Sequence, residues 1–276
     1  MSARVALVTG STDGIGKATA RSLLADGWEV IVTGRSRARG EATVAELAAA
    51  IPGARVSLEV ADLSVMADVA RLGRAVASTR SQLDLLLLNA NAVTQEHRLT
   101  SEGFESNMAI GFYGRALLAL TLAPLLEATA RAQVLAVVGL NLERLDFEAP
   151  DGPQNFSSMR ALGRWQWAIQ SFGREWSRRM KTPFNTYMPG LVKTKILADE
   201  PQPMRAFVKV ANWLMGIPVA QSGDELAWVV KDLATNPRRD GYYSRKTFKG
   251  TRALKEQPND SAAVWALAER KLAPFR

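Results

Sequence analysis

The first ninety residues alternate between short apolar runs and longer amphipathic stretches. The apolar runs have the length of β-strands and are Arg4–Thr9, Glu29–Thr33, Val56–Val60 and Leu83–Leu88. The stretches between them carry apolar residues at helical spacing and are Gly16–Asp26, Glu41–Ile51 and Val65–Thr79. Strands that are apolar along their whole length are typical of parallel sheets buried on both faces. The pattern predicts such a sheet, covered by helices on both sides.

The same alternation continues through the second half of the chain. It predicts helices at Phe104–Ala123 and Leu162–Met180, and strands at Gln133–Val138 and Phe184–Met188. No repeat, low-complexity segment or linker interrupts it. We therefore predict one doubly wound α/β domain of the Rossmann type over residues 1–276, with a central parallel sheet and helices on both faces.

Two segments break the alternation, Leu140–Arg160 and Lys195–Pro218. Both leave from the predicted carboxyl ends of strands, which is where doubly wound sheets bind their ligands. We expect them to wall a pocket, with residues 195–218 as an apolar lid over a hydrophobic small-molecule substrate. The large apolar side chains of this lid, Phe207, Trp213 and Met215, could equally fill the core or a dimer contact. The sequence therefore leaves open whether the chain forms a homo-oligomer.

Composition narrows the functional classes. The chain contains no cysteine, which excludes disulfides, thiolate metal sites and thiol nucleophiles and fits the reducing cytoplasm, the location we expect. No metal site is predicted. The longest apolar run, around Ala116–Leu126, is broken by Pro124 and is shorter than the ~20 residues of a membrane span. The net charge is +8, but the basic residues are dispersed rather than gathered in a stripe with aromatics, so no nucleic-acid partner is expected.

The most specific local pattern is the turn Thr9–Gly16, with the sequence TGSTDGIG, between the first predicted strand and the first predicted helix. Glycines permit a tight turn there and let backbone N–H groups approach a pyrophosphate, whose charge the helix N-terminus stabilises. The spacing is G-x-x-x-G-x-G. It predicts a dinucleotide site whose contacts come from Gly10, Ser11, Asp13, Gly14, Ile15 and Gly16.

The end of the second predicted strand indicates which dinucleotide is bound. An acidic residue there would bind a ribose 2′-hydroxyl, whereas an arginine accepts a 2′-phosphate. No Asp or Glu occurs from Ile31 to Arg39; Arg35 stands there, with Lys17 on the facing helix. A guanidinium matches phosphate oxygens with paired hydrogen bonds. The predicted cofactor is NADP(H).

On this turn and on further motifs, the chain resembles the short-chain dehydrogenase/reductase family, in particular its retinol-dehydrogenase-like branch. The further motifs are Asp62-Leu63, Leu88–Ala92 with Asn91 in place of the usual glycine, Asn107, Met188–Thr194 and the tail Ala263–Glu269. The resemblance implies an active-site asparagine at Asn107. It also implies cofactor contacts from Asp62, Leu63, Asn89, Ala90, Pro189, Gly190, Val192 and Thr194.

The family's catalytic group is a serine after the fifth strand and a Y-x-x-x-K pair on the next helix. In the family the tyrosine protonates the alkoxide, the lysine binds the nicotinamide ribose and lowers the tyrosine pKa, and the serine bonds the substrate oxygen. Here Gly139 or Val138 stands at the serine position. Leu162 stands at the tyrosine and Gln166 at the lysine.

A shift of register cannot restore this motif, because no tyrosine lies between Tyr113 and Tyr187. A positioned general acid contributes about 10²–10⁴-fold, and leucine supplies none of it. Gln166 can still bond ribose hydroxyls, but it carries no charge to tune a neighbouring pKa. We therefore expect slow reduction of ordinary ketones and intact cofactor binding.

The first functional hypothesis is an oxidoreductase with altered acid–base chemistry, of a kind suited to biosynthesis. It would pass hydride to a hydrophobic activated acceptor, such as a conjugated enone, quinone or iminium, or use another proton donor. The candidate donors are Tyr187, Tyr113, His97 and Lys193, with Asn107 acting through water.

Two other hypotheses stay open because a fold does not fix a function. A non-redox cyclase, isomerase or dehydratase would use the polar groups Asn107, Asn141, Arg164 and Gln166. A cofactor-binding regulator without catalysis would use Arg164–Trp167 as an interface, since arginine and aromatics are enriched in interfaces. A serine hydrolase is not expected, because no nucleophile-elbow motif occurs.

Overall fold

A computed structural model describes residues 3–139, 143–152, 156–193, 216–250 and 259–276, and the single residues 202, 206, 213 and 257. Its centre is an eight-stranded sheet in the order β3-β2-β1-β4-β5-β6-β7-β8. All neighbouring strands are parallel except the last pair. The strands are β1 (Val5–Val8), β2 (Glu29–Gly34), β3 (Arg55–Val60), β4 (Leu85–Leu88), β5 (Gln133–Val137), β6 (Phe184–Met188), β7 (Tyr242–Ser244) and β8 (Thr247–Phe248).

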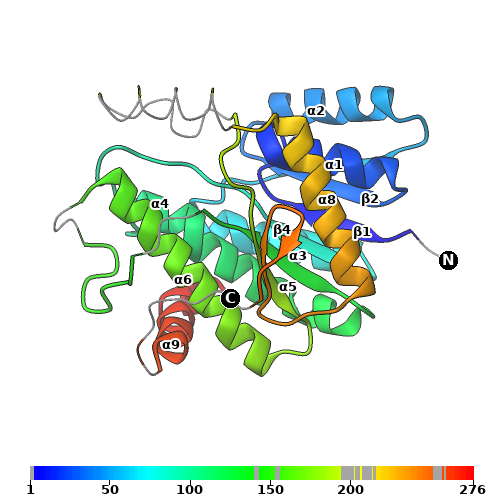
Figure 1. Cartoon of the computed structure of the whole chain (residues 1–276). Coiled ribbons are helices and arrows are strands. Elements are labelled where there is room, and N and C mark those ends of the chain that lie inside the picture. Colours follow the sequence, from blue (N-terminus) through cyan, green and yellow to red (C-terminus); the bar gives the residue numbers. More distant parts are fainter. Residues whose placement is uncertain are drawn as a thin grey trace.

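Helices cover both faces of this sheet, with α1, α2 and α8 on one side and α6 and α9 among those on the other (Figure 1). The helices are α1 (Gly14–Ala25), α2 (Arg37–Ala50), α3 (Met66–Thr79), α4 (Ser106–Met108), the π-helical η1 (Ala109–Tyr113), α5 (Gly114–Ala128), α6 (Ser158–Arg179), α8 (Val219–Thr235), α9 (Asp260–Leu272) and the short 3₁₀ turn η2 (Ala273–Phe275). The predicted doubly wound α/β fold is confirmed.

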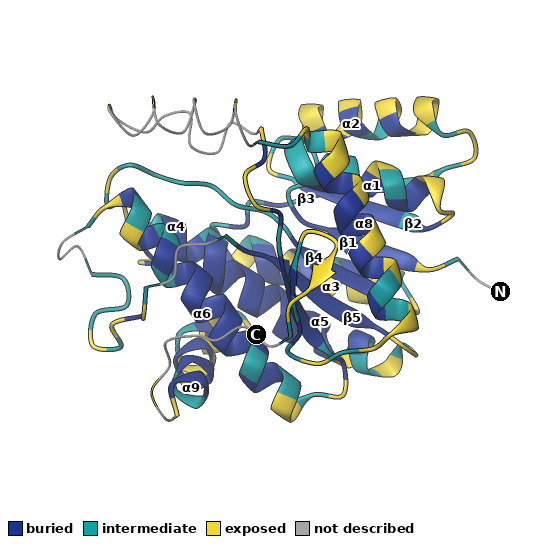
Figure 2. Cartoon of the chain, viewed as in Figure 1, coloured by how far each residue is buried: buried dark blue, intermediate teal, exposed yellow. Residues whose placement is uncertain are grey.

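The sheet divides the core into two apolar clusters, because successive side chains of a strand point to opposite faces. In β1, Val5 and Leu7 pack with α3, α5, α6 and α9, whereas Ala6 and Val8 pack with α1, α2 and α8. The central strands are buried on both sides (Figure 2), which explains why their sequences are continuously apolar.

Several elements differ from the sequence predictions at their ends. Helix α2 begins at Arg37, because the Ser36 hydroxyl accepts a hydrogen bond from the Arg39 backbone N–H and caps the helix. Ser157 caps α6 in the same way, so the helix begins inside the segment predicted as a loop. Helix α8 and strands β7 and β8 were not predicted from the pattern.

Helices α4, η1 and α5 form one continuous element, Ser106–Ala128, through the core. By length and composition it could cross a membrane, but 78% of its most apolar window is buried inside the fold. Such burial is typical of a central core helix. No other helix among the described residues meets the same criterion.

The structure corrects the interface hypothesis for Arg164–Trp167. Trp165 and Trp167 are buried in the core cluster beneath α6 and cannot present their rings to a partner. Most of the predicted lid, residues 195–218, lies outside the described residues, including Phe207 and Met215. Trp213 is described and is 76% exposed.

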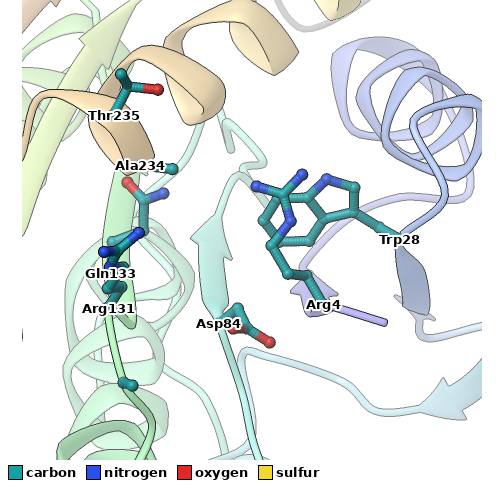
Figure 3. A pocket seen from close by; sticks show the side chains of 8 residues that line it. Arg4, Trp28, Asp84, Arg131, Gln133, Ala234 and Thr235 are labelled. Atoms are coloured by element: carbon teal, nitrogen blue, oxygen red, sulfur yellow. The ribbon is translucent and has the colours of Figure 1, made fainter. Parts of the chain in front are cut away.

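A hollow of about 270 Å³ lies at the end of the sheet where the parallel strands begin (Figure 3). Arg4 lies over the ring of Trp28, with the guanidinium carbon 4.2 Å from the ring centroid. Gln133 and Arg131 line the other side. This hollow lies at the opposite edge of the sheet from the glycine-rich turn, because Arg4 precedes β1 and the turn follows it.

Candidate functional site

The turn after β1 has a conformation that requires its glycines. Gly10 has a φ of +63°, and a Cβ there would lie 2.7 Å from the Ala90 Cα. A Cβ on Gly16 would lie 2.4 Å from the Gly10 carbonyl oxygen. Gly14 has a φ of +58°, and its Cβ position has no heavy atom within 4 Å. The turn is thus closed toward the sheet and open beyond Gly14, where α1 begins.

Side chains beneath the turn hold it in place. The Asn89 amide donates to the carbonyl oxygens of Thr9 and Gly10 at 3.0 and 3.2 Å. The Thr9 hydroxyl accepts from the backbone N–H groups of Asn89 and Ala90. The buried Ser11 hydroxyl donates to the Val8 carbonyl at 2.7 Å. These bonds tie the end of β4 to the turn, so Asn89 and Ser11 shape the site from below.

The remaining predicted turn residues lie at its outer end. The Asp13 side chain accepts from the Gly14 N–H at 2.7 Å and caps α1. Ile15 is partly buried and packs against the core cluster of α1, α2 and α8. Backbone N–H groups at the start of α1 thus face the open space beyond Gly14, an arrangement suited to binding an anion.

The predicted phosphate-binding arginine lies at the other end of this region. Arg35 directly follows β2 and is exposed, and within the described ranges no hydrogen bond or ion pair engages it. Lys17, the second predicted cation, pairs with Glu46 at 2.5 Å, so its charge is already compensated. Asp62 accepts from the backbone and hydroxyl of Ser64 at 2.9 and 2.6 Å. Leu63 beside it is buried in the core.

The carboxyl end of β5 meets α6 at Gln166. The Gln166 side chain is 1% exposed, and its Oε1 accepts a hydrogen bond from the Gly139 backbone N–H. A Cβ on Gly139 would lie 2.7 Å from that oxygen. Leu162, one helical turn before Gln166, is half-buried against the core. The structure thus brings the predicted Gly139, Leu162 and Gln166 to one place.

Strand β6 is the neighbour of β5 in the sheet, so the loop after β6 leaves the sheet next to the contact between Gly139 and Gln166. Gly190 has a φ of +75° with open space at its Cβ position, which suits the predicted Pro189-Gly190 turn. Val192 forms a β-bridge with Ile217. Asn141 and Thr194, predicted as catalytic and cofactor-binding residues, lie outside the described residues.

Arg115 on α5 is a residue near the site that the sequence analysis missed. It is 2% exposed, and its two Nη atoms donate to the carbonyl oxygens of Val137 and Ala90 at 2.8 and 2.7 Å. Those carbonyls lie at the carboxyl ends of β5 and β4. The signal was available, because Arg115 is the one charged residue within the apolar stretch 108–126.

Asn91 stands where the resemblance implies glycine, and its side-chain amide oxygen has an unusual environment. Its amide oxygen is buried without a hydrogen-bond partner among the described residues. A buried unpaired acceptor is costly unless a ligand or water completes it. At the end of β4, this oxygen is therefore available to a bound molecule.

Asn107 lies in α4, and its side-chain amide is fully engaged. Its Oδ1 accepts from the Thr94 N–H at 2.8 Å, and its Nδ2 donates to the Thr94 hydroxyl and to Glu105, both at 2.8 Å. These bonds anchor the loop after β4 to α4. These bonds give the Asn107 side chain a structural role, and the relay through water stays a prediction.

Two other predicted proton donors meet at Asp151. The Tyr113 hydroxyl donates to the Asp151 carboxylate at 3.3 Å, and that carboxylate also pairs with Lys271 at 2.8 Å. Burial, followed by the nearby Asp151 charge, raises the pKa of Tyr113 far above its usual range. The His97 ring nitrogen lies 2.8 Å from the Asp151 carbonyl oxygen. Both residues fasten the loop after β5.

Tyr187 lies on the wrong face of the sheet to act as the predicted donor. It is fully buried in the cluster of α1, α2 and α8, whereas Gln166 lies on α6 across the sheet. Burial, with a further contribution from Glu225, raises the pKa of Tyr187 well above its usual value. Lys193 bonds Ile217 through its backbone and is exposed.

Comparison with known proteins identifies the group to which this arrangement belongs. The family model described as short chain dehydrogenase matches residues 4–142, half of the chain. Mouse polyprenol dehydrogenase (Mus musculus) is 29% identical over 88% of this chain and 74% of its own length. Retinol dehydrogenase 12 of Bos taurus is 30% identical over 70% of this chain and 63% of its own length, so the chain spans under two thirds of that relative.

A solved structure gives the same assignment of the fold. The alcohol dehydrogenase of Thermococcus sibiricus, complexed with 5-hydroxy-NADP, superposes with a TM-score of 0.68 at 19% identity. The match covers 92% of this chain and all of that one. The chain therefore belongs to the short-chain dehydrogenase family, whose members are oxidoreductases.

Proposed function

We propose that the chain is an NADP(H)-dependent oxidoreductase that acts on a hydrophobic, activated carbonyl compound without the family's tyrosine proton donor. The observation that carries the proposal is the contact between Gly139 and Gln166. It fills the place where the resemblance implies serine and lysine side chains. The pKa-lowering charge and the substrate-orienting hydroxyl are both missing from that place.

The residues present fit a nicotinamide dinucleotide. The space beyond Gly14 is open at the N-terminus of α1, and a Cβ on Gly10 or Gly16 would collide with backbone atoms. The turn would hold the pyrophosphate, and the exposed Arg35 would take the 2′-phosphate. Gln166, Pro189 and Gly190 would hold the nicotinamide half. The nicotinamide ring, when bound, supplies or accepts a hydride.

The protein's own groups determine which acceptors react. Leu162 places an aliphatic side chain where the family donates a proton, so a simple ketone would have to develop alkoxide charge unassisted. In a conjugated enone, the substrate takes the hydride at its β-carbon and the electron pair moves onto the carbonyl oxygen. The resulting enolate delocalises its charge and takes a proton from water afterwards.

Two observations support a hydrophobic substrate, namely the names of the relatives and the exposed apolar side chains near the proposed site. Two relatives are named for polyprenol and retinol, both long apolar alcohols. Trp213, in the predicted lid, and Leu191, beside the nicotinamide loop, are exposed apolar side chains. A substrate that covers apolar side chains of this kind gains about 25 cal/mol for each Å² removed from water.

The experiment measures NADPH oxidation with paired substrates of equal chain length, one a conjugated enone and the other its saturated ketone. We expect turnover of the enone and at least a hundredfold lower kcat/KM for the ketone. Equal, rapid reduction of both would refute the proposed lack of a proton donor. Product formation in the absence of any nicotinamide cofactor would favour a cyclase, isomerase or dehydratase instead.

A further inference from the structure

Arg115 is a buried cation with no acidic partner in the described part of the chain. Burial lowers its pKa to about 9, so the guanidinium remains charged at neutral pH. Two backbone carbonyls accept its hydrogen bonds, and its guanidinium carbon lies 4.7 Å from the ring centroid of Trp165. A buried charge of this kind lowers stability unless an opposite charge compensates it. Carbonyl dipoles and an aromatic face offset only part of that cost.

The position of this charge connects it with the proposed site. Val137 is the last residue of β5, and Ala90 follows β4 by two residues. Trp165, on which the guanidinium stacks, directly precedes Gln166. The charge therefore lies under the sheet edge where Gln166 meets Gly139. A dinucleotide in a doubly wound fold straddles the point where the strand order reverses, here between β1 and β4. A dinucleotide bound in this way would have its nicotinamide half on the β4–β5–β6 side, where Arg115 bonds the ends of β4 and β5.

We propose that Arg115 makes the site prefer the reduced cofactor, so that the chain binds NADPH more tightly than NADP⁺. The oxidised nicotinamide ring carries a positive charge, whereas the reduced ring is neutral. A fixed cation near the bound ring would therefore disfavour NADP⁺ relative to NADPH. Gln166 contributes no charge to this balance, and Arg115 is the one buried lysine or arginine among the described residues. The inference rests on the proposed binding of NADP(H).

The size of the effect follows from Coulomb's law. At an effective dielectric constant of about 20, a charge within about 10 Å of the ring would change the binding ratio by about tenfold or more. A purely structural role would weaken both forms of the cofactor by the same factor. The ratio of the two dissociation constants thus separates the electrostatic role from the structural one.

The experiment is calorimetric titration of NADP⁺ and NADPH into the wild-type chain and into Arg115→Met and Arg115→Gln. We expect the wild type to bind NADPH at least tenfold more tightly than NADP⁺, and both neutral variants to lose about tenfold of that preference. Arg174→Met is the matched control. Arg174 is also a partly buried arginine, but it lies further along α6 and is paired with Asp240, so its loss should leave the ratio unchanged.

The outcomes are distinct. An unchanged ratio in a folded neutral variant that still binds both forms overturns the proposal and leaves the proposed function intact. If neither neutral variant folds, the wild type decides. A dissociation constant for NADP⁺ that is equal to or smaller than the one for NADPH overturns the proposal. Absence of binding by the wild type overturns the proposed function, and this inference with it.

Discussion

At the turn between β1 and α1, each glycine and each supporting side chain has a visible structural reason. Asn89, Thr9 and Ser11 bond the backbone from below, and the open space lies outside at Gly14. Between β5 and α6, the side-chain amide of Gln166 accepts a hydrogen bond from the Gly139 backbone. One half of the proposed site therefore has a backbone arrangement suited to binding a phosphate. In the other half, the described residues place Gln166 and Gly139 where the resemblance implies a lysine and a serine.

The largest effect is expected from a methyl group at the turn. Gly16→Ala places a Cβ against the Gly10 carbonyl and the Asn89 amide, both of which are fixed by other bonds. We expect the free energy of unfolding to fall by about 2–3 kcal/mol and the affinity for NADPH to fall at least a hundredfold. Calorimetry and urea unfolding measure the two quantities.

Gly14→Ala is the matched control for this prediction. Its Cβ would meet open space, so the cost is the positive φ alone, about 1–2 kcal/mol. A Gly16→Ala variant that binds NADPH as the wild type does would show that the turn is not the phosphate site.

The other half of the crevice is tested by adding what it lacks. The triple variant Gly139→Ser, Leu162→Tyr, Gln166→Lys supplies a hydroxyl, a proton donor and a charge at the family positions. We expect kcat/KM for a saturated ketone to rise by about a hundredfold, the usual contribution of a positioned general acid. The double variant without the tyrosine should gain little. A double variant that matches the triple one would contradict the proposed role of Leu162.

A smaller effect is expected at Arg35. Arg35→Glu should weaken NADPH by about ten- to a hundredfold, because one charge-assisted contact contributes about 1.5–3 kcal/mol, and should leave NADH within a few fold. Arg37→Glu is the control, since Arg37 is exposed nearby and faces Glu41. Equal losses for the two cofactors would remove the assignment of the 2′-phosphate to Arg35.

Sequence patterns predicted strands β1 to β6, the main helices between them and the glycine-rich turn, because apolar periodicity and turn chemistry are local properties. They could not place Tyr187, whose side-chain direction depends on which face of β6 meets α8. Asn107 was predicted as a relay, yet its amide is occupied by Thr94 and Glu105, partners that become adjacent only when the loop folds. Arg115 was overlooked because its partners are backbone carbonyls on two strands, which no side-chain motif records.

The buried tyrosines predict a pH dependence of stability that involves neither half of the crevice. Burial raises the pKa of Tyr113, Tyr187 and Tyr243, whereas an unfolded tyrosine ionises near pH 10. Above pH 10 the folded state retains protons that the unfolded state has released, so stability falls as pH rises, by about 1.4 kcal/mol per pH unit for each fully buried tyrosine. Below pH 10 this contribution is constant. Arg115 has the opposite effect on stability. Burial lowers its pKa to about 9, so above that pH the folded state has released a proton that the unfolded state retains, and this contribution raises stability as pH rises. Urea unfolding between pH 9 and 11 measures the balance.

The smallest effect is expected from Tyr187→Phe, which separates a buried tyrosine from a catalytic one. Within the described part of the chain, neither the buried Tyr187 hydroxyl nor the Ser222 hydroxyl makes a hydrogen bond of ordinary geometry. Deletion of the Tyr187 hydroxyl therefore removes no strong contact among these residues. Because the ring lies across the sheet from Gln166, we expect kcat/KM and the NADPH affinity to stay within about twofold of the wild type, and the unfolding free energy at pH 7 to change by less than about 1 kcal/mol. Above pH 10, the unfolding free energy should fall less steeply with pH, by about 1.4 kcal/mol per pH unit, because one buried tyrosine has been removed. A large loss of kcat with normal cofactor affinity would mean that Tyr187 reaches the substrate. The reacting half would then have its proton donor, and the contrast between the two halves would no longer hold.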